Sequence, residues 1–303
     1  LCYCNIHFMQ AVVFIYLFIF GAFAGSFLNL ISDRLPVGKK IVFGRSVCDF
    51  CKKTLKVKNL IPIFSFIFQK GRCSFCNKKL SFYHPFSELL TGVAFMLSGH
   101  LSKFSYEINA ESVFLLFYYI VVFSFFIVMV LTDMKFCLIL DSVIIPSIIF
   151  VFLTSVIFRF LDLSEIYNNL KNDSFGVYLL QTDFFTNRVI LSLKDFGYVV
   201  GGAILIALFF QFLILITKGR GMGDADVKLG FLIGLVNGFP MAFMAVFMGY
   251  VLGAFYSVFL MLMKKKTMKD SIPFGPFLIL GSVLILLFGN QIWLWYSGLG
   301  SLF

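Results

Sequence analysis

Long stretches without a charged residue constrain the fold more than any other feature of this sequence. A helix needs about 20 apolar residues to cross the hydrocarbon core of a bilayer. Several stretches approach or exceed that length, namely residues 11–32, 112–132, 142–158, 196–217 and 272–303. They lack the alternation of apolar and polar residues that is typical of membrane β-strands. We therefore predict an all-α, polytopic membrane protein.

Composition supports this class of protein. Of the 303 residues, 60% are hydrophobic and 13% are charged, which excludes an ordinary soluble domain of this length. A further uncharged stretch, residues 229–263, has basic residues at both ends, so we expect it to cross the membrane an even number of times. It forms either two short crossings that turn near residues 237–240 or a re-entrant half-helix. The chain is then expected to hold about seven or eight transmembrane helices.

The positive charge is concentrated in one segment. Residues 32–85 contain twelve Lys and Arg and two acidic residues, which accounts for the entire net charge of +10. Basic loops remain on the cytoplasmic side of a membrane, so we predict that this segment is cytoplasmic. The same charge could also bind anionic lipid directly. The predicted organisation is a first transmembrane helix at 1–31, the basic loop at 32–85, and a membrane-embedded domain at 86–303 with an external loop at 161–195.

Two Cys-x-x-Cys pairs lie inside this basic loop. Cys48 and Cys51 form one pair, Cys73 and Cys76 form the other, and 21 residues separate them. Four thiolates at this spacing are typical of a tetrahedral zinc site, and the reducing cytoplasm disfavours disulfides. A loop of roughly 50 residues can hardly build a core alone, so a metal would supply folding energy. We predict a structural zinc site, in preference to a thioredoxin-like redox centre or a nucleic-acid-binding ribbon, and expect no nucleic-acid partner.

Acidic residues occur at three places on the predicted cytoplasmic face. They are Asp133 with Asp141, Asp224 with Asp226, and Glu88. Ionisable groups beside transmembrane helices are costly, so each is a candidate for function. Two carboxylates held close together share a proton, which lets one activate water while the other protonates the carbonyl or the leaving amine. This pattern indicates aspartic-protease chemistry. The alternative is a flexible glycine turn in which Asp226 caps the following helix.

Motifs spread between residues 25 and 229 form a recognisable set. They are Gly-Ser-Phe-Leu-Asn at 25–29, Asp-Arg-Leu-Pro at 33–36, the two Cys-x-x-Cys pairs, Tyr-His-Pro at 83–85 followed by Glu88, Thr132 with Asp133, and residues 221–229. Together these stretches resemble the type IV prepilin peptidase family, one branch of the GxGD aspartyl proteases.

The resemblance implies an activity, a substrate and a cofactor. Members cleave prepilins and pseudopilins after the Gly that ends a short basic leader, at the cytoplasmic face of the inner membrane. Many also methylate the new N-terminus with S-adenosylmethionine. The resemblance implies that Asp133 and Asp226 are the catalytic pair, because Val-Lys-Leu follows Asp226 as in the family. A literal GxGD motif ends instead at Asp224, which is the alternative second aspartate.

Two positions depart from the family pattern. Ala225 stands where Gly usually precedes the second aspartate, and Leu140 stands where Pro usually precedes the residue that matches Asp141. The second difference weakens any role of Asp141 beyond helix capping. Glu88 is a candidate for positioning or deprotonating the amine that is methylated, whereas pairing with a basic residue of the loop is the alternative.

The sequence leaves three other functions open. The protein could be a peptidase without methyltransferase activity, since nothing resembles the glycine-rich cofactor fold of soluble methyltransferases. It could be a small membrane transporter with acidic residues in an ion path, although the acids cluster at one predicted face instead of forming a chain across the membrane. It could also be a zinc-bearing scaffold without catalytic activity. We expect the peptidase, acting on prepilin-like proteins.

Overall fold

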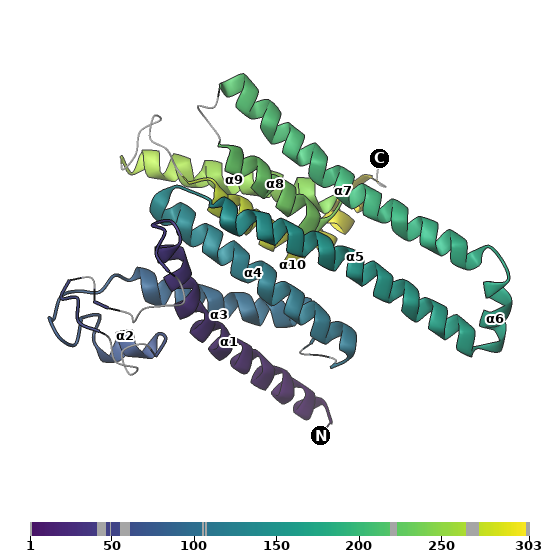
Figure 1. Ribbon diagram of the computed structural model, residues 1–303, viewed down its shortest axis with the longest axis horizontal. Coiled ribbons are helices and arrows are strands. Elements are labelled where there is room, and N and C mark those ends of the chain that lie inside the picture. The colour runs from purple at the N-terminus through teal and green to yellow at the C-terminus, as the bar shows by residue number, and fades with distance from the viewer. Residues whose placement is uncertain are drawn as a thin grey trace. The chain divides into compact units, whose positions relative to one another are not determined.

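The protein is almost entirely helical over the part of the chain that a computed structural model describes. This part comprises residues 2–40, 47–48, 50–54, 61–104, 106, 108–218, 223–264 and 273–300, with side chains described from Met9 to Ser297. The helices are α1 (Cys2–Arg34), α2 (Phe64–Phe68), α3 (Tyr83–Leu101), α4 (Ala110–Phe136), α5 (Asp141–Asn172), α6 (Ser174–Leu180), α7 (Phe184–Thr217), α8 (Asp224–Asn237), α9 (Met241–Leu262) and α10 (Gly275–Gly300) (Figure 1). The predicted all-α class is confirmed.

Six of these helices are long and apolar enough to cross a membrane, namely α1, α4, α5, α7, α9 and α10. The other two helices of some length fall short for different reasons. In α3, Glu88 and two histidines interrupt the apolar sequence, and α8 has only 14 residues, about 21 Å at 1.5 Å per residue. The multi-pass architecture is therefore confirmed, whereas the total of seven or eight crossings stays a prediction.

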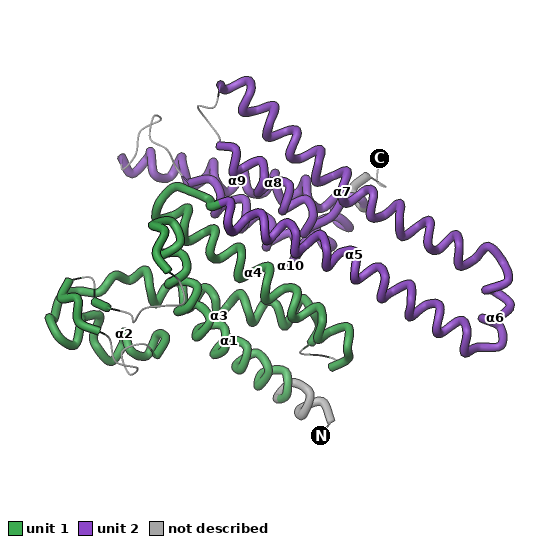
Figure 2. Tube along the Cα trace, viewed as in Figure 1, with its two compact units in different colours: residues 1–140 green, residues 141–303 purple. Residues whose placement is uncertain are grey.

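The chain divides into two compact units, residues 1–140 and residues 141–303 (Figure 2). In the first unit, α1 packs against α3 at very short range. A Cβ atom at Gly21 would lie 2.7 Å from the carbonyl oxygen of Thr91, and one at Gly25 would lie 2.9 Å from Cα of Glu88. Small residues let helices approach closely in lipid, where no hydrophobic force drives them together. This packing positions the α3 residues that surround Glu88.

In the second unit, α8 and α9 form a hairpin. The turn between them lies at residues 238–240, where the sequence predicted a turn within the uncharged stretch 229–263. At the end of α8, the side-chain amide of Asn237 donates to the hydroxyl of Ser282 in α10 at 2.6 Å. A buried polar contact of this kind holds helices in register, because no water is present in hydrocarbon to replace it.

The segment 161–195 differs from the irregular loop that the sequence analysis expected. The structure continues α5 to Asn172, places α6 after it, and begins α7 at Phe184. The physical reason is composition, since the segment contains no proline and one glycine, so little interrupts helical hydrogen bonding. At 32 residues, α5 is about 48 Å long, which exceeds the roughly 30 Å of a hydrocarbon core. The external location of this segment stays a prediction.

The contact between α9 and α10 yields a stability prediction. A Cβ atom at Gly281 would lie 2.4 Å from the carbonyl oxygen of Ala245 and 2.6 Å from the amide nitrogen of Gly249, both on the backbone of α9. We expect Gly281→Ala to lower the free energy of unfolding by about 1–3 kcal/mol, the usual cost of overpacking. Thermal unfolding of the detergent-solubilised protein measures this. Gly201→Ala is the matched control, because no atom lies within 4 Å of its added methyl group. Equal stability of the two variants would contradict the packing.

Candidate functional site

The four cysteines of the basic loop converge on one point. Their sulfur atoms all lie within 4.8 Å of one another, and those of Cys48 and Cys76 are 3.9 Å apart. Four sulfurs around a zinc ion at about 2.3 Å would be separated by roughly 3.8 Å, so the donor set fits a tetrahedral ion. Cys48 and Cys73 are buried, whereas Cys51 and Cys76 are partly exposed. The cluster is therefore able to hold a metal.

Two copies of the same tight turn bring these sulfurs together. In the first turn, the Cys48 amide donates to the Lys53 carbonyl at 3.0 Å, and in the second, the Cys73 amide donates to the Lys78 carbonyl at 2.9 Å. Each turn also contacts the other through a lysine and a phenylalanine. The ammonium of Lys53 in the first turn lies 5.6 Å from the ring centre of Phe75 in the second, and that of Lys78 in the second lies 4.8 Å from the ring centre of Phe50 in the first. The turns at the two Cys-x-x-Cys pairs thus have the same geometry. In the sequence, the only sign of this repeat is the identical spacing of the cysteines within each pair.

The second turn favours a thiolate. Backbone N–H groups of Phe75 and Cys76 donate to the sulfur of Cys73 and lower the pKa of its thiol to about 6. A thiolate is the form of cysteine that binds metals. In the same turn, a backbone hydrogen bond from Lys78 is outweighed by burial and the neighbouring sulfurs, which raise the pKa of the Cys76 thiol to about 11, so the preference for a thiolate is that of Cys73.

Asp133 lies in the last turn of α4 and is buried, with 6% of its surface exposed. The surrounding helix end is tied to both neighbours within the first unit. The hydroxyl of Tyr83 in α3 donates to the carbonyl of Leu131 at 3.4 Å, and the ammonium of Lys135 contacts the carboxylate of Asp33 in α1 at 2.6 Å. These contacts hold the end of α4, and with it the backbone of Asp133.

Glu88 links α3 to the basic loop that carries the four cysteines, called the cysteine loop below. Its side chain is buried, and one carboxylate oxygen accepts a hydrogen bond from the amide of Ile63 at 2.7 Å. Ile63 has a φ of 61°, which is unfavourable for a β-branched residue, and the amide of Phe64 closes a three-residue turn onto the Pro62 carbonyl at 2.5 Å. The partner of Glu88 in this contact is thus a backbone amide of the loop, where the sequence analysis considered a basic side chain.

In the second unit, Asp224 and Asp226 lie in the first turn of α8. Gly223 is the residue that precedes the helix, and the Asp226 carboxylate accepts a hydrogen bond from its amide at 3.2 Å. Asp226 is partly buried, whereas Asp224 is exposed. The helix begins three residues earlier than the sequence suggested, so Asp226 lies inside the first turn and reaches back to its start. The adjacent residues 219–222 of the glycine-rich motif lie outside the described part of the chain.

Asp141 has a partner that sequence reasoning missed. The ammonium of Lys228 in α8 contacts its carboxylate at 2.5 Å, so the start of α5 is joined to the start of α8. Both side chains are substantially exposed, and such pairs contribute only about 0–1 kcal/mol. The pair places the start of α5 next to the turn of α8 that carries Asp226. No local pattern in the sequence signals a contact between residues so far apart in the chain.

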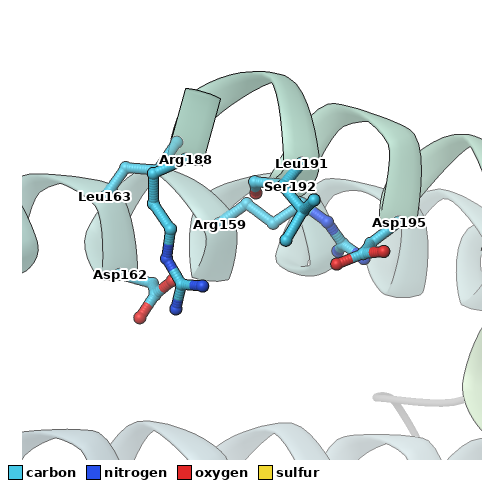
Figure 3. A pocket seen from close by; sticks show the side chains of 7 residues that line it. All are labelled: Arg159, Asp162, Leu163, Arg188, Leu191, Ser192 and Asp195. Carbon is cyan, nitrogen blue, oxygen red and sulfur yellow. The ribbon is translucent and has the colours of Figure 1, made fainter. Parts of the chain in front are cut away.

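A charged pocket between α5 and α7 was also not anticipated. It has a volume of about 220 Å³ and is lined by Arg159, Asp162, Leu163, Arg188, Leu191, Ser192 and Asp195 (Figure 3). Arg159 points toward Asp195, and Arg188 extends to the same side as Asp162 (Figure 3). The charges are three residues apart on α5 and seven apart on α7, spacings that place them on one face of each helix, and this was a signal for helices in the segment 161–195. Each helix contributes one basic and one acidic residue to the pocket.

The predicted site residues thus fall into two groups. Asp133, Glu88 and the cysteine cluster belong to the first unit, and Asp224 and Asp226 belong to the second. Within the first unit, the structure brings Glu88 into contact with the loop that carries the cysteines. The pairing of Asp133 with Asp226 stays a prediction.

Comparison with known proteins identifies the family. The chain is 33% identical over 276 residues to a prepilin leader peptidase/N-methyltransferase of Bacillus subtilis, covering 91% of this chain and 94% of that relative. Relatives with the same name from Stutzerimonas stutzeri and Pseudomonas aeruginosa are 26% and 25% identical, over 90% of this chain in each case. The chain belongs to the prepilin leader peptidase/N-methyltransferase family. No solved structure matches it.

A second comparison locates one domain of this family in the chain. Residues 19–101 match the family model described as the bacterial peptidase A24 N-terminal domain. The match covers the C-terminal half of α1, the loop that carries the cysteines, and α3, and therefore includes the cysteine cluster and Glu88. The resemblance that the motifs indicated is thereby confirmed.

The cysteine cluster leads to a prediction on metal content. Purified, reduced protein that has been exposed to zinc should contain about one zinc ion per chain, because four thiolates complete one tetrahedral site. Cys73→Ser should lose the metal and make the loop more sensitive to proteases. Cys137→Ser is the matched control, since Cys137 is exposed and lies outside the cluster. Absence of zinc from the unmutated protein by elemental analysis would disprove this site.

Proposed function

We propose that the protein is a prepilin peptidase that removes the basic leader of prepilin-like or pseudopilin proteins after a Gly and then methylates the new N-terminus. The observation that carries the proposal is the identity of 33%, over nearly the whole length of both chains, with a relative named for both activities. The substrates are expected to be membrane proteins themselves, with an apolar helix after the leader. The transporter alternative has no observation in its favour.

Cleavage is assigned to Asp133 and Asp226. The pair would share one proton at the start of the reaction. The ionised carboxylate would accept a proton from the attacking water, and the protonated one would donate its proton to the carbonyl oxygen or to the amine that leaves when the peptide bond breaks. Support for Asp133 comes from its burial at the end of α4 and from the contacts that hold that helix end. A buried acid within a membrane protein is costly and is kept where it has a task.

The choice of Asp226 over Asp224 rests on local geometry and on the motif. Asp226 is partly buried, its carboxylate is oriented by the amide of Gly223, and Val-Lys-Leu follows it. Asp224 is exposed at the first position of the helix, where a carboxylate stabilises the helix dipole without further function. Asp224 is therefore assigned an auxiliary role.

The catalytic aspartates, the zinc loop and the leader of the substrate are placed on the cytoplasmic side of the inner membrane. The support is the positive charge of residues 32–85, because basic loops are retained in the cytoplasm. Zinc, held by the four cysteines, would act structurally by closing a loop that has little apolar core of its own. In this assignment the metal takes no part in cleavage.

Methylation with S-adenosylmethionine rests on the names of the relatives. Nothing in the described part of the chain resembles the glycine-rich cofactor fold of soluble methyltransferases. Glu88 is proposed to contribute on the protein side, because its buried carboxylate joins the loop to α3 and one oxygen is already engaged by Ile63. It would either position the new N-terminal amine or accept its proton.

The aspartate assignment predicts a specific pattern of activity. Asp133→Asn and Asp226→Asn should each lower the cleavage rate by about three orders of magnitude or more, because each removes one proton-transfer group of a unit that acts together. Asp224→Asn should retain measurable activity, and it serves as the matched control two residues away. Cleavage of a prepilin substrate by membranes that contain equal amounts of each variant measures this. An inactive Asp224→Asn with an active Asp226→Asn would shift the assignment by two residues.

The role of Glu88 can be tested by comparing two variants. Glu88→Gln keeps an oxygen that can accept the Ile63 amide, whereas Glu88→Ala removes it. We expect Glu88→Gln to retain cleavage but to lower methyl transfer by about a hundredfold, the lower end of a general-base contribution. Transfer of label from S-adenosylmethionine to a cleaved prepilin measures the effect.

The other outcomes also discriminate between roles. If Glu88→Gln transfers the methyl group at the full rate and Glu88→Ala does not transfer it, the role of Glu88 is limited to holding the loop through the Ile63 amide. Full transfer by both variants would remove Glu88 from the mechanism. Absence of transfer by the unmutated protein would favour a peptidase without methyltransferase activity.

A further inference from the structure

The short helix α2 in the cysteine loop exposes one apolar face. Phe64, Ile67 and Phe68 lie at positions i, i+3 and i+4, so they share one side of the helix, and 62%, 62% and 83% of their surfaces are exposed. We call this set the apolar face of α2. On another side of α2, the ring of Phe66 is partly buried and lies 5.9 Å from that of Phe82. Large apolar side chains gathered in this way on a polar loop mark an interaction surface.

A hydrogen bond attaches the start of α2 to α3, next to the first membrane-spanning helix. The amide of Ile63, immediately before α2, donates to Glu88 at 2.7 Å. Glu88 lies against Gly25 of α1, where an added Cβ atom would be 2.9 Å from Cα of Glu88. Gly25 is nine residues before the end of α1 at Arg34, within a helix long and apolar enough to span the bilayer. The start of α2 is thus attached to α3 beside the C-terminal third of α1, a helix long and apolar enough to span the bilayer.

Exposed basic residues follow the apolar face along the chain. Exposed lysines and arginines follow α2 in sequence, namely Lys70, Arg72, Lys78 and Lys79. Across residues 32–85, basic residues outnumber acidic ones by twelve to two, and one of those two acids, Asp33, is paired with Lys135. Apolar side chains flanked by basic ones, at the level of a bilayer surface, are the arrangement of interfacial segments that bind anionic lipid.

We infer that α2 lies in the membrane interface, with Phe64, Ile67 and Phe68 inserted among the lipid chains and the flanking basic residues bound to anionic lipid headgroups. The basic charge argues against the alternative occupant, the substrate. The leader of a prepilin is itself basic under the proposed function, so the same residues would repel it. An anionic leaflet complements both the charge and the apolar face.

A fluorescent reporter at position 68 tests the location of α2. Phe68→Trp is placed in full-length protein that also carries Trp293→Phe and Trp295→Phe, which removes the two native tryptophans. The protein is reconstituted into nanodiscs of phosphatidylcholine with or without phosphatidylglycerol, with acyl chains brominated near the glycerol backbone. Because bromine quenches tryptophan at short range, we expect about a twofold or greater loss of emission, with a larger loss in the discs that contain phosphatidylglycerol.

Charge variants test the headgroup contacts. Lys70→Glu with Arg72→Glu should abolish the difference between the two lipid compositions, and a rise in ionic strength should reduce it. Lys103→Glu is the control, because Lys103 is an exposed lysine outside the basic loop. Persistence of the difference in the double variant would overturn the role of the basic residues.

Two outcomes would overturn the location itself. Emission typical of water, without quenching in either disc, would show that α2 is away from the bilayer. A change of emission only after a prepilin is added, independent of lipid charge, would assign the apolar face to substrate binding. Either result would leave the proposed peptidase activity intact, because the reporter measures the position of α2 and not cleavage.

Discussion

Hydrocarbon offers no partner for a backbone amide or carbonyl, and this constraint governs how each part of the chain folds. Uncharged stretches of 17 or more residues must form helices, since a helix satisfies its own hydrogen bonds. Lipid also removes the hydrophobic force between helices, so close packing depends on small residues. The contacts of Gly25 against α3 and of Gly281 against α9 are of this kind, with backbone and side-chain atoms close enough to exclude a methyl group.

The same constraint places the ionisable groups at helix ends. Asp133 lies in the last turn of α4, Asp226 in the first turn of α8, and Glu88 in the second turn of α3. Asp226 and Glu88 each accept a hydrogen bond from a backbone amide, that of Gly223 and that of Ile63 respectively. Asp133 lies in a helix turn that contacts with α1 and α3 hold in place. At a helix end, a carboxylate avoids the high cost of a charge at the centre of the bilayer.

The basic loop that carries the cysteines, residues 32–85, is a short polar segment whose described part has a defined structure. Its two tight turns are copies of one another, and their four sulfurs are close enough to share an ion. The loop is also joined to α3 through the hydrogen bond between Ile63 and Glu88. The cysteine cluster and the hydrogen bond from Ile63 to Glu88 lie at different points of the loop, and α2 lies between them in the chain. An apolar face that is held in place can serve as a contact surface.

The sequence by itself determined the helical class, the approximate helices, the cysteines that cluster, and the family. It did so because apolar length, Cys-x-x-Cys spacing and motif order are local properties of the chain. The tertiary structure decided what depends on partners distant in sequence. It showed that 161–195 is largely helical, that Glu88 binds the amide of Ile63 in place of a basic side chain, and that Asp141 pairs with Lys228. These contacts join residues 25 and 87 positions apart, and no local pattern encodes them, because they arise only when helix packing brings the side chains together.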